Sequence, residues 1–264
     1  MKLCDLTAET EGTFFRCLHD EKADDPRVIE MRRRWYAKFS PLGLRAKVLI
    51  EDSGEVVGLC QYLPVEHSGF IGEGLMAILC MWVHGYEHHV GDRQGRGLGR
   101  FMLEAIEADA RAAGAKGVAA WGKDFPYWNP VSFYEHMGYV RADQDGTNVL
   151  VWKAFDSDVA VPKLPRVSRS MPAGEKTVNV TVFIDGWCSG GVGCCVQARE
   201  AVAALGEIVS YEEVDTSDRA KMRQCGAVFD GIYLDGEPYH PDGPPRTTEQ
   251  LIADIRQRHE EKSG

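Results

Sequence analysis

The stretch that decides the fold of this chain is Gln94-Gly95-Arg96-Gly97-Leu98-Gly99. It follows an apolar run at residues 75–83 and opens a segment of helical periodicity that ends at residue 113. A strand, a glycine-rich turn and a helix in this order form an anion-binding site, because glycine lets the backbone approach a ligand and the helix start offers free N–H groups. Arg96 and Arg100 add positive charge beside the turn, so we expect a phosphorylated ligand here.

Two common phosphate-binding motifs do not fit this stretch. The nucleotide P-loop has Lys-Ser or Lys-Thr after its last glycine, whereas this chain has Arg100-Phe101. The dinucleotide fingerprint spaces its glycines as G-x-G-x-x-G and needs an acidic residue at the end of the next strand. Here the glycines are closer together, and the next apolar strand ends at Trp121-Gly122-Lys123, with a cation in the acidic position.

The pattern that remains, Gln/Arg-x-x-Gly-x-Gly/Ala, resembles the acyl-CoA pyrophosphate loop of the GNAT-type N-acetyltransferase superfamily. A second stretch is similar to the N…FYexxGF element that follows this loop in the family: Asn129-Pro130-Val131-Ser132-Phe133-Tyr134-Glu135-His136-Met137-Gly138-Tyr139. The resemblance covers residues 1–155, where the expected element order βααβββαβαββ is also the GNAT-type order. It implies an α/β fold with a mixed, V-splayed sheet and helices on both sides.

The resemblance implies an enzyme that transfers acetyl from acetyl-CoA to a primary amine. It assigns the pyrophosphate, the pantetheine arm and the acetyl carbonyl to two backbone segments and to neighbouring side chains. The implied cofactor-binding residues are Met81, Trp82 and Val83 on the strand, Gln94, Gly95, Arg96, Gly97, Leu98, Gly99 and Arg100 at the loop, and Asn129 in the second motif.

The resemblance also implies that Tyr134 protonates the sulfur of the leaving CoA. A phenol titrates near 10, close to a thiol, so proton transfer between the two is nearly balanced. A tyrosine followed by x-x-x-Gly also fits an amphipathic helix that ends in a glycine cap. Both interpretations of Tyr134 stay open on the sequence alone.

Size and charge limit the partners of the chain. Its 264 residues allow two modest domains, no apolar run is long enough to span a membrane, and the start lacks a signal-peptide core. We therefore expect a cytoplasmic protein. The net charge of −10 disfavours nucleic acid and suits a cationic acceptor, either a small amine or a peptide amine. The oligomeric state stays open, a homodimer included.

A change of composition predicts a second domain. Residues 156–175 contain Pro162, Pro165 and Pro172 among scattered polar residues, and we expect a linker there. The predicted domains are therefore residues 1–155 and 176–264.

The C-terminal part resembles the thioredoxin-like α/β fold. An expected strand at residues 177–184 runs into a Gly- and Cys-rich turn, and a helix is expected at residues 196–205. Trp187-Cys188 lies at this turn, where that fold keeps its redox cysteine. An acetyltransferase with such an extension weakly resembles the YoaP-type group.

Four cysteines in this part, Cys188, Cys194, Cys195 and Cys225, have three interpretations. They could be reactive thiolates activated by a helix start, with a Cys188–Cys194 disulfide as a redox switch. They could bind a soft metal ion, since thiolates select soft ions. They could also be small buried residues without chemistry. A different class of function follows from the first two: an acyl-CoA-binding thiol or metal sensor without turnover.

The general base is not assigned by the sequence. His84, His88 and His89 precede the glycine loop. A neutral histidine there could deprotonate an ammonium, the three could bind a metal, or they could simply be solvated loop residues. Glu66, His67 and Glu73 are further candidates.

Overall fold

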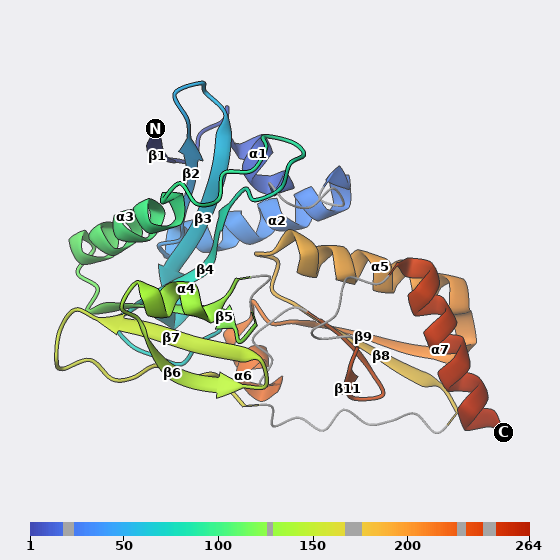
Figure 1. Ribbon diagram of the computed structural model, residues 1–264. Coiled ribbons are helices and arrows are strands. Elements are labelled where there is room, and N and C mark those ends of the chain that lie inside the picture. Colours follow the sequence, from blue (N-terminus) through green and yellow to red (C-terminus); the bar gives the residue numbers. More distant parts are fainter. Residues whose placement is uncertain (18–23, 126–128, 167–175, 226–230, 240–246) are drawn as a thin grey trace. The chain divides into compact units, whose positions relative to one another are not determined.

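The computed structural model describes residues 1–17, 24–125, 129–166, 176–225, 231–239 and 247–264, without the side chains of residues 223–225 (Figure 1). The chain divides into two compact units. Unit 1 comprises Met1–Glu21 and Tyr36–Pro165, and unit 2 comprises Lys22–Trp35 and Arg166–Gly264. Among the described residues, no helix combines the length and the apolar character needed to cross a membrane.

Unit 1 is built on a mixed sheet of seven described strands, in the order β1-β2-β3-β4-β5-β7-β6. The strands are β1 (Lys2–Asp5), β2 (Arg45–Ile50), β3 (Val56–Pro64), β4 (Met76–Val83), β5 (Gly117–Lys123), β6 (Val140–Asp145) and β7 (Asn148–Ala154). The helices are α1 (Glu11–Arg16), α2 (Pro26–Phe39), α3 (Leu98–Ala112) and α4 (Val131–His136). All neighbours are antiparallel except β4 and β5, which are parallel. The mixed sheet that the sequence predicts is thereby confirmed.

The core of unit 1 lies between this sheet and α3. Met102, Leu103 and Ile106 of α3 are completely buried, and they pack with apolar residues of β2 to β5. The spacing of these residues along α3 places them on one face of the helix, which is why the segment after the glycine loop folds as an amphipathic helix. The packing of this face fixes the orientation of α3 on the sheet, and with it the position of the glycine loop at the start of the helix.

Two segments belong to a different unit from the one that the sequence pattern predicts. Residues up to Trp35 of α2 group with unit 2, where Val28 is buried in the core and Arg27 forms a 2.7 Å ion pair with Glu200. The first part of the expected linker belongs to unit 1, because Lys163 and Ile71 exchange backbone hydrogen bonds of 2.8 Å. The rest of the expected linker, residues 167–175, lies outside the described residues.

Unit 2 has a four-stranded sheet among its described residues, in the order β11-β10-β8-β9. The elements are β8 (Val178–Ile184), α5 (Ser189–Leu205), β9 (Val209–Asp215), α6 (Arg219–Cys225), β10 (Gly231–Leu234), β11 (Glu237–Pro238) and α7 (Thr248–Ser263). Strand β8 pairs in parallel with β9 and antiparallel with β10. Helix α7 begins at Thr248, after a capping box between the N-cap Thr247 and Gln250.

The start of α5 corrects the sequence analysis. We expected a glycine-rich turn up to residue 195, but the helix already begins at Ser189 and includes three of the glycines. Val192 and Cys195 are completely buried in the core of unit 2. Burial of this face outweighs the low helix propensity of glycine, which costs about 1 kcal/mol per residue relative to alanine.

A glycine at the start of β5 gives a test of this packing. A Cβ on Gly117 would lie 2.6 Å from the Lys153 carbonyl oxygen and 2.9 Å from a Leu75 methyl group. Because the oxygen belongs to the paired strand β7, we expect Gly117→Ala to lower the stability of this sheet by about 2 kcal/mol. Native-state hydrogen exchange of the β5 and β7 amides measures this change.

The matched control is Gly12→Ala in α1, where a Cβ meets nothing within 4 Å. This variant should be neutral or slightly stabilising, since alanine favours helix more than glycine does. Equal protection in the Gly117→Ala variant and the wild type would contradict the packing of β5 on β7.

Candidate active site

The strands β4 and β5 separate at the centre of unit 1. They pair only at Met76↔Val118 and Ala77↔Ala119. On the other side, β4 stays paired with β3 as far as Val83, with a register shift opposite Gln61 and Tyr62. Beyond Ala77, β4 is therefore no longer paired with β5. Trp121 of β5 reaches across with its indole N–H, which donates a 2.8 Å hydrogen bond to the Leu79 carbonyl.

The glycine loop leads directly into α3. Gly95 and Gly97 have positive φ angles of 69° and 74°, which L-residues with a side chain rarely adopt. Gly97 is the N-cap residue and has no side chain to cap the helix. The first helical hydrogen bond runs from the Phe101 N–H to the Gly97 carbonyl, at 3.0 Å. The N–H groups of residues 98–100 therefore have no partner within the helix, as an anion site requires.

Gln94 differs from its predicted role in one respect. We expected its backbone N–H to hold pyrophosphate, but this N–H donates a 2.7 Å hydrogen bond to the Asp92 carboxylate. The Gln94 side chain lies against Gly85, so closely that a Cβ on Gly85 would be 2.1 Å from Gln94 Nε2. These contacts fix the loop entrance and leave the anion site to the amides that follow.

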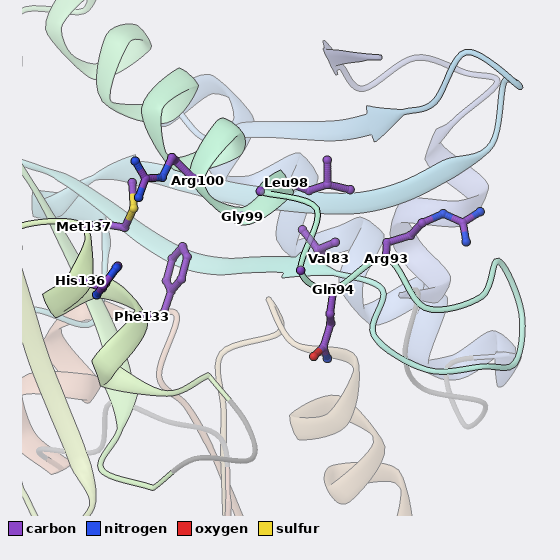
Figure 2. A pocket seen from close by; sticks show the side chains of 11 residues that line it. Val83, Arg93, Gln94, Leu98, Gly99, Arg100, Phe133, His136 and Met137 are labelled. Atoms are coloured by element: carbon purple, nitrogen blue, oxygen red, sulfur yellow. The ribbon is translucent and has the colours of Figure 1, made fainter.

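A pocket of about 360 Å³ lies at this helix start. Figure 2 shows Phe133, His136 and Met137 of the α4 segment on one side and Leu98, Gly99 and Arg100 of α3 on the other. Its lining residues are Val83, Arg93, Gln94, Gly95, Gly97, Leu98, Gly99, Arg100, Phe133, His136 and Met137. The pocket thus joins the end of β4, the glycine loop and α4, which carry the two motifs of the sequence.

Tyr134 lies in the same short helix but is buried behind the pocket wall. It is 2% exposed and packs edge-to-face against Phe133 and Tyr139, with ring centroids 5.2 and 5.6 Å away. Burial raises the pKa of Tyr134 well above its usual value, and the nearby thiols of Cys80 and Cys60 act in the same direction. The phenol is therefore protonated at neutral pH, as an acid must be.

The family comparison agrees with this geometry. Residues 45–141 match the family model described as acetyltransferase (GNAT) domain. The chain carries a GNAT acetyltransferase domain. The predicted acyltransferase class is thereby confirmed for these residues.

One relative shares most of the chain with this protein. This relative is the uncharacterised N-acetyltransferase YoaP of Bacillus subtilis (strain 168), which is 25% identical to this chain over 226 residues. The alignment covers 79% of this chain and 81% of YoaP. The covered share exceeds unit 1, so the similarity extends into unit 2.

Solved GNAT structures resemble the chain over a smaller share. The PaiA N-acetyltransferase of Thermoplasma acidophilum, in complex with coenzyme A, is 16% identical with a TM-score of 0.41, covering 58% of this chain and 98% of its own. A GNAT family acetyltransferase of Brucella melitensis, in complex with acetyl-CoA, is 19% identical with a TM-score of 0.39, covering 60% and 94%. Because both TM-scores lie below 0.5, no activity is transferred from either structure.

Some predicted residues of the GNAT domain do not line the pocket. They are Met81, Trp82, Arg96, Asn129 and Tyr134. Asn129 has a positive φ of 44°, and its side-chain amide donates a 2.8 Å hydrogen bond to the Trp121 carbonyl. Asn129 therefore stabilises the turn after β5, and a contact with CoA stays a prediction.

One wall of the pocket was not predicted from the sequence. Phe133, His136 and Met137 lie three and four residues apart, a helical spacing that puts them on one face of the α4 segment. This spacing around Tyr134 is visible in the sequence and could have predicted that the three side chains share one face. Arg93, also missed, comes just before the glycine loop.

The candidate bases of the GNAT domain differ in their surroundings. His84 is completely buried, and its Nδ1 lies 3.0 Å from the Gly91 carbonyl oxygen, so it is not a solvated loop residue. His88 and His89 are exposed, and their rings contact His84. Glu66 accepts a 2.7 Å hydrogen bond from the Gly74 N–H.

The C-terminal cysteines of unit 2 occupy different positions on α5. Cys188 is the half-buried N-cap residue, whereas Cys194 and Cys195 lie more than a turn into the helix. At about 1.5 Å per residue, Cys188 and Cys194 are about 9 Å apart along the axis, but a disulfide needs Cα atoms within about 7 Å. A Cys188–Cys194 disulfide therefore requires the first turns of α5 to unwind.

The surroundings of Cys195 suit a structural residue. It is completely buried, and Glu213, whose pKa is lowered mainly by its hydrogen bond with Arg199, also accepts a hydrogen bond from the Cys195 thiol. The soft-metal interpretation gains no support, since no three His, Cys, Asp or Glu side chains come together as ligands within the described part of the chain. The side chain of Cys225 lies outside that part.

Proposed function

We propose that the GNAT domain transfers acetyl from acetyl-CoA to a primary amine. The observation that carries this proposal is the pocket at the start of α3, where unbonded backbone amides, Arg100 and the apolar end of β4 meet. We further propose residues 1–155 and 176–264 as the two functional domains.

The chain supplies three groups to this reaction. Amides at residues 98–100 bind the diphosphate, with the N-terminal end of α3 adding favourable electrostatic interaction. The end of β4 around Met81 to Val83, beyond its pairing with β5, binds the pantetheine arm and places the thioester in the gap between β4 and β5. When the amine attacks the carbonyl carbon and the C–S bond breaks, the Tyr134 hydroxyl protonates the sulfur.

The acceptor is either a small amine or a peptide amine, and it carries a positive charge before it reacts. The net charge of −10 attracts such a molecule over long range. Attack requires the neutral amine, so one proton must leave before or during attack. Binding both substrates in one gap would supply much of the rate through proximity.

The test is to incubate the protein with acetyl-CoA and a panel of amines and to follow CoA release with a thiol reagent. Repeated turnover with at least one amine supports the proposal. Tight acetyl-CoA binding without turnover on any amine would instead favour a sensor that binds acyl-CoA as a signal.

We also propose that unit 2 is a thioredoxin-like domain whose reactive thiol is Cys188. Its element order and the parallel β8–β9 pair next to an antiparallel β10 support this fold. Cys188 is the N-cap residue of a helix with free N–H groups, which lowers thiol pKa values in general. The adjacent Ser189 hydroxyl is buried without a hydrogen-bond partner in the described residues.

We expect Cys188 to be the fastest-reacting of the three α5-segment thiols. At pH 7 its alkylation by iodoacetamide should be at least about tenfold faster than that of Cys194 or Cys195, because only Cys188 combines exposure with the helix start. Peptide mass spectrometry after timed labelling measures the three rates.

The Cys194→Ser variant is the matched control and should keep the fast reaction, whereas Cys188→Ser should lose it. If Cys194 were alkylated as fast as Cys188 in the wild type, Cys188 would not be the reactive thiol.

A further inference from the structure

A carboxylate outside both sequence motifs lies beside the glycine loop. Glu51 follows β2 directly and belongs to the hairpin that leads into β3. Its N–H donates to the Glu55 carbonyl and its own carbonyl accepts from the Gly54 N–H, both at 2.9 Å. The Glu51 side chain is only 13% exposed, so both its backbone and its carboxylate have well-defined positions.

This carboxylate contacts two arginines of the loop. Its Oε1 lies 2.7 Å from Nη1 of Arg96, and its Oε2 lies 3.2 Å from Nε of Arg93. Arg93 is also held by its backbone, since its N–H donates a 2.9 Å hydrogen bond to the His84 carbonyl. In Figure 2 the Arg93 side chain points away from Phe133 and His136.

The three arginines near the loop therefore have different tasks. Arg93 and Arg96 are tied to Glu51, whereas Arg100 forms no ion pair within the described residues and lines the pocket. A guanidinium has five N–H donors in a fixed fork. Arg96 can thus keep its ion pair with Glu51 while its N–H groups donate to a phosphate oxygen.

We propose that Glu51 is a positioning residue for acyl-CoA binding. It holds the half-exposed Arg96 in the glycine loop, two residues before the first of the free amides, and, through Arg93, fixes the entrance of the loop. An unheld arginine would lose side-chain freedom when the ligand binds, whereas a held one has already lost it. This inference rests on the proposed function, because it assumes that the loop binds the diphosphate of acetyl-CoA.

The test is Glu51→Gln, which keeps the size of the side chain and the backbone bonds of the hairpin. We expect the Kd for acetyl-CoA, measured by calorimetry, to rise about fivefold to tenfold, and the KM to rise with it. The kcat at saturating acetyl-CoA should stay within twofold, because Glu51 does not contact the reacting atoms. Thermal melting verifies that the variant is folded.

The matched control is Glu55→Gln on the same hairpin. Glu55 Oε2 lies 3.7 Å from Arg93 Nη2 and its side chain is 53% exposed, so its loss should change the Kd less than twofold. The double variant Glu51→Gln/Arg96→Gln should bind no more weakly than Arg96→Gln alone, since Glu51 acts mainly through Arg96.

Two results would overturn the role of Glu51: acetyl-CoA binding in Glu51→Gln as tight as in the wild type or tighter, or additive losses in the double variant. Tighter binding would mean that the carboxylate only repels the ligand. A wild-type protein that does not bind acetyl-CoA at all would instead reject the proposed function, so the two failures are distinguishable.

Discussion

Replacing Tyr134 with Phe is expected to lower kcat by at least about tenfold, with the Kd for acetyl-CoA within twofold of wild type. The substitution removes one oxygen and keeps the ring, so the edge-to-face contacts with Phe133 and Tyr139 remain. The sulfur would then leave without a proton from the chain. Initial rates at saturating amine, with acetyl-CoA binding measured separately by calorimetry, divide the effect between chemistry and affinity.

The burial of Tyr134 is the physical reason for this expectation. A buried phenol whose pKa is raised stays protonated through the neutral range, so the acid is always in the competent form. The same raised pKa makes proton donation to a solvated thiolate unfavourable. Proton transfer from Tyr134 is therefore efficient only if the sulfur also leaves the water, as it would in the gap between β4 and β5.

Tyr139 provides the matched control for this experiment. It is 3% exposed, lies in the same cluster, and burial likewise raises its pKa. Tyr139→Phe should change kcat less than about threefold, because the proposed reaction gives its hydroxyl no proton to transfer. An unchanged kcat in Tyr134→Phe, or equal losses in both variants, would leave Tyr134 with the structural role that a helix before a glycine cap suggests.

The local features of unit 1 could be predicted from the sequence because they depend on short segments. Glycines at 95 and 97 occur where the backbone needs positive φ angles, and the apolar spacing of α3 repeats every three or four residues. The order of strands and helices followed from such segments, and the GNAT domain match confirms what they predicted. Gly138, at a φ of 83°, terminates the α4 segment as its position after Tyr134 indicated.

Features that depend on distant contacts could not be predicted in this way. Glu51 meets Arg96 across 45 positions of sequence, and nothing near Glu51 distinguishes it from a solvated hairpin residue. The helix α5 starts earlier than its glycines suggest, because the burial of Val192 on the sheet decides its extent. The burial of Val28 in unit 2 likewise depends on packing between segments far apart in the chain.

The largest effect on ligand binding is expected at Gly99. A Cβ built there would lie 3.2 and 3.3 Å from two carbons of the Phe133 ring, so α3 and the α4 segment are in close contact at this position. Gly99→Ala requires the ring to move by a few tenths of an ångström, and a mild loss of affinity should follow. Gly99→Val adds an isopropyl group inside the pocket, and we expect acetyl-CoA to bind at least about thirtyfold more weakly, equivalent to about 2 kcal/mol.

Phe133 makes this prediction specific. If the loss arises from crowding against its ring, the double variant Gly99→Val/Phe133→Ala should lose less affinity than the two single variants together. Ala112→Val, at an exposed position in the last turn of the same helix, should bind acetyl-CoA like the wild type. Calorimetry with acetyl-CoA compares the wild type with these four variants. Wild-type affinity in Gly99→Val would mean that the ligand does not enter between α3 and the α4 segment, because no ligand could share that narrow space with a valine.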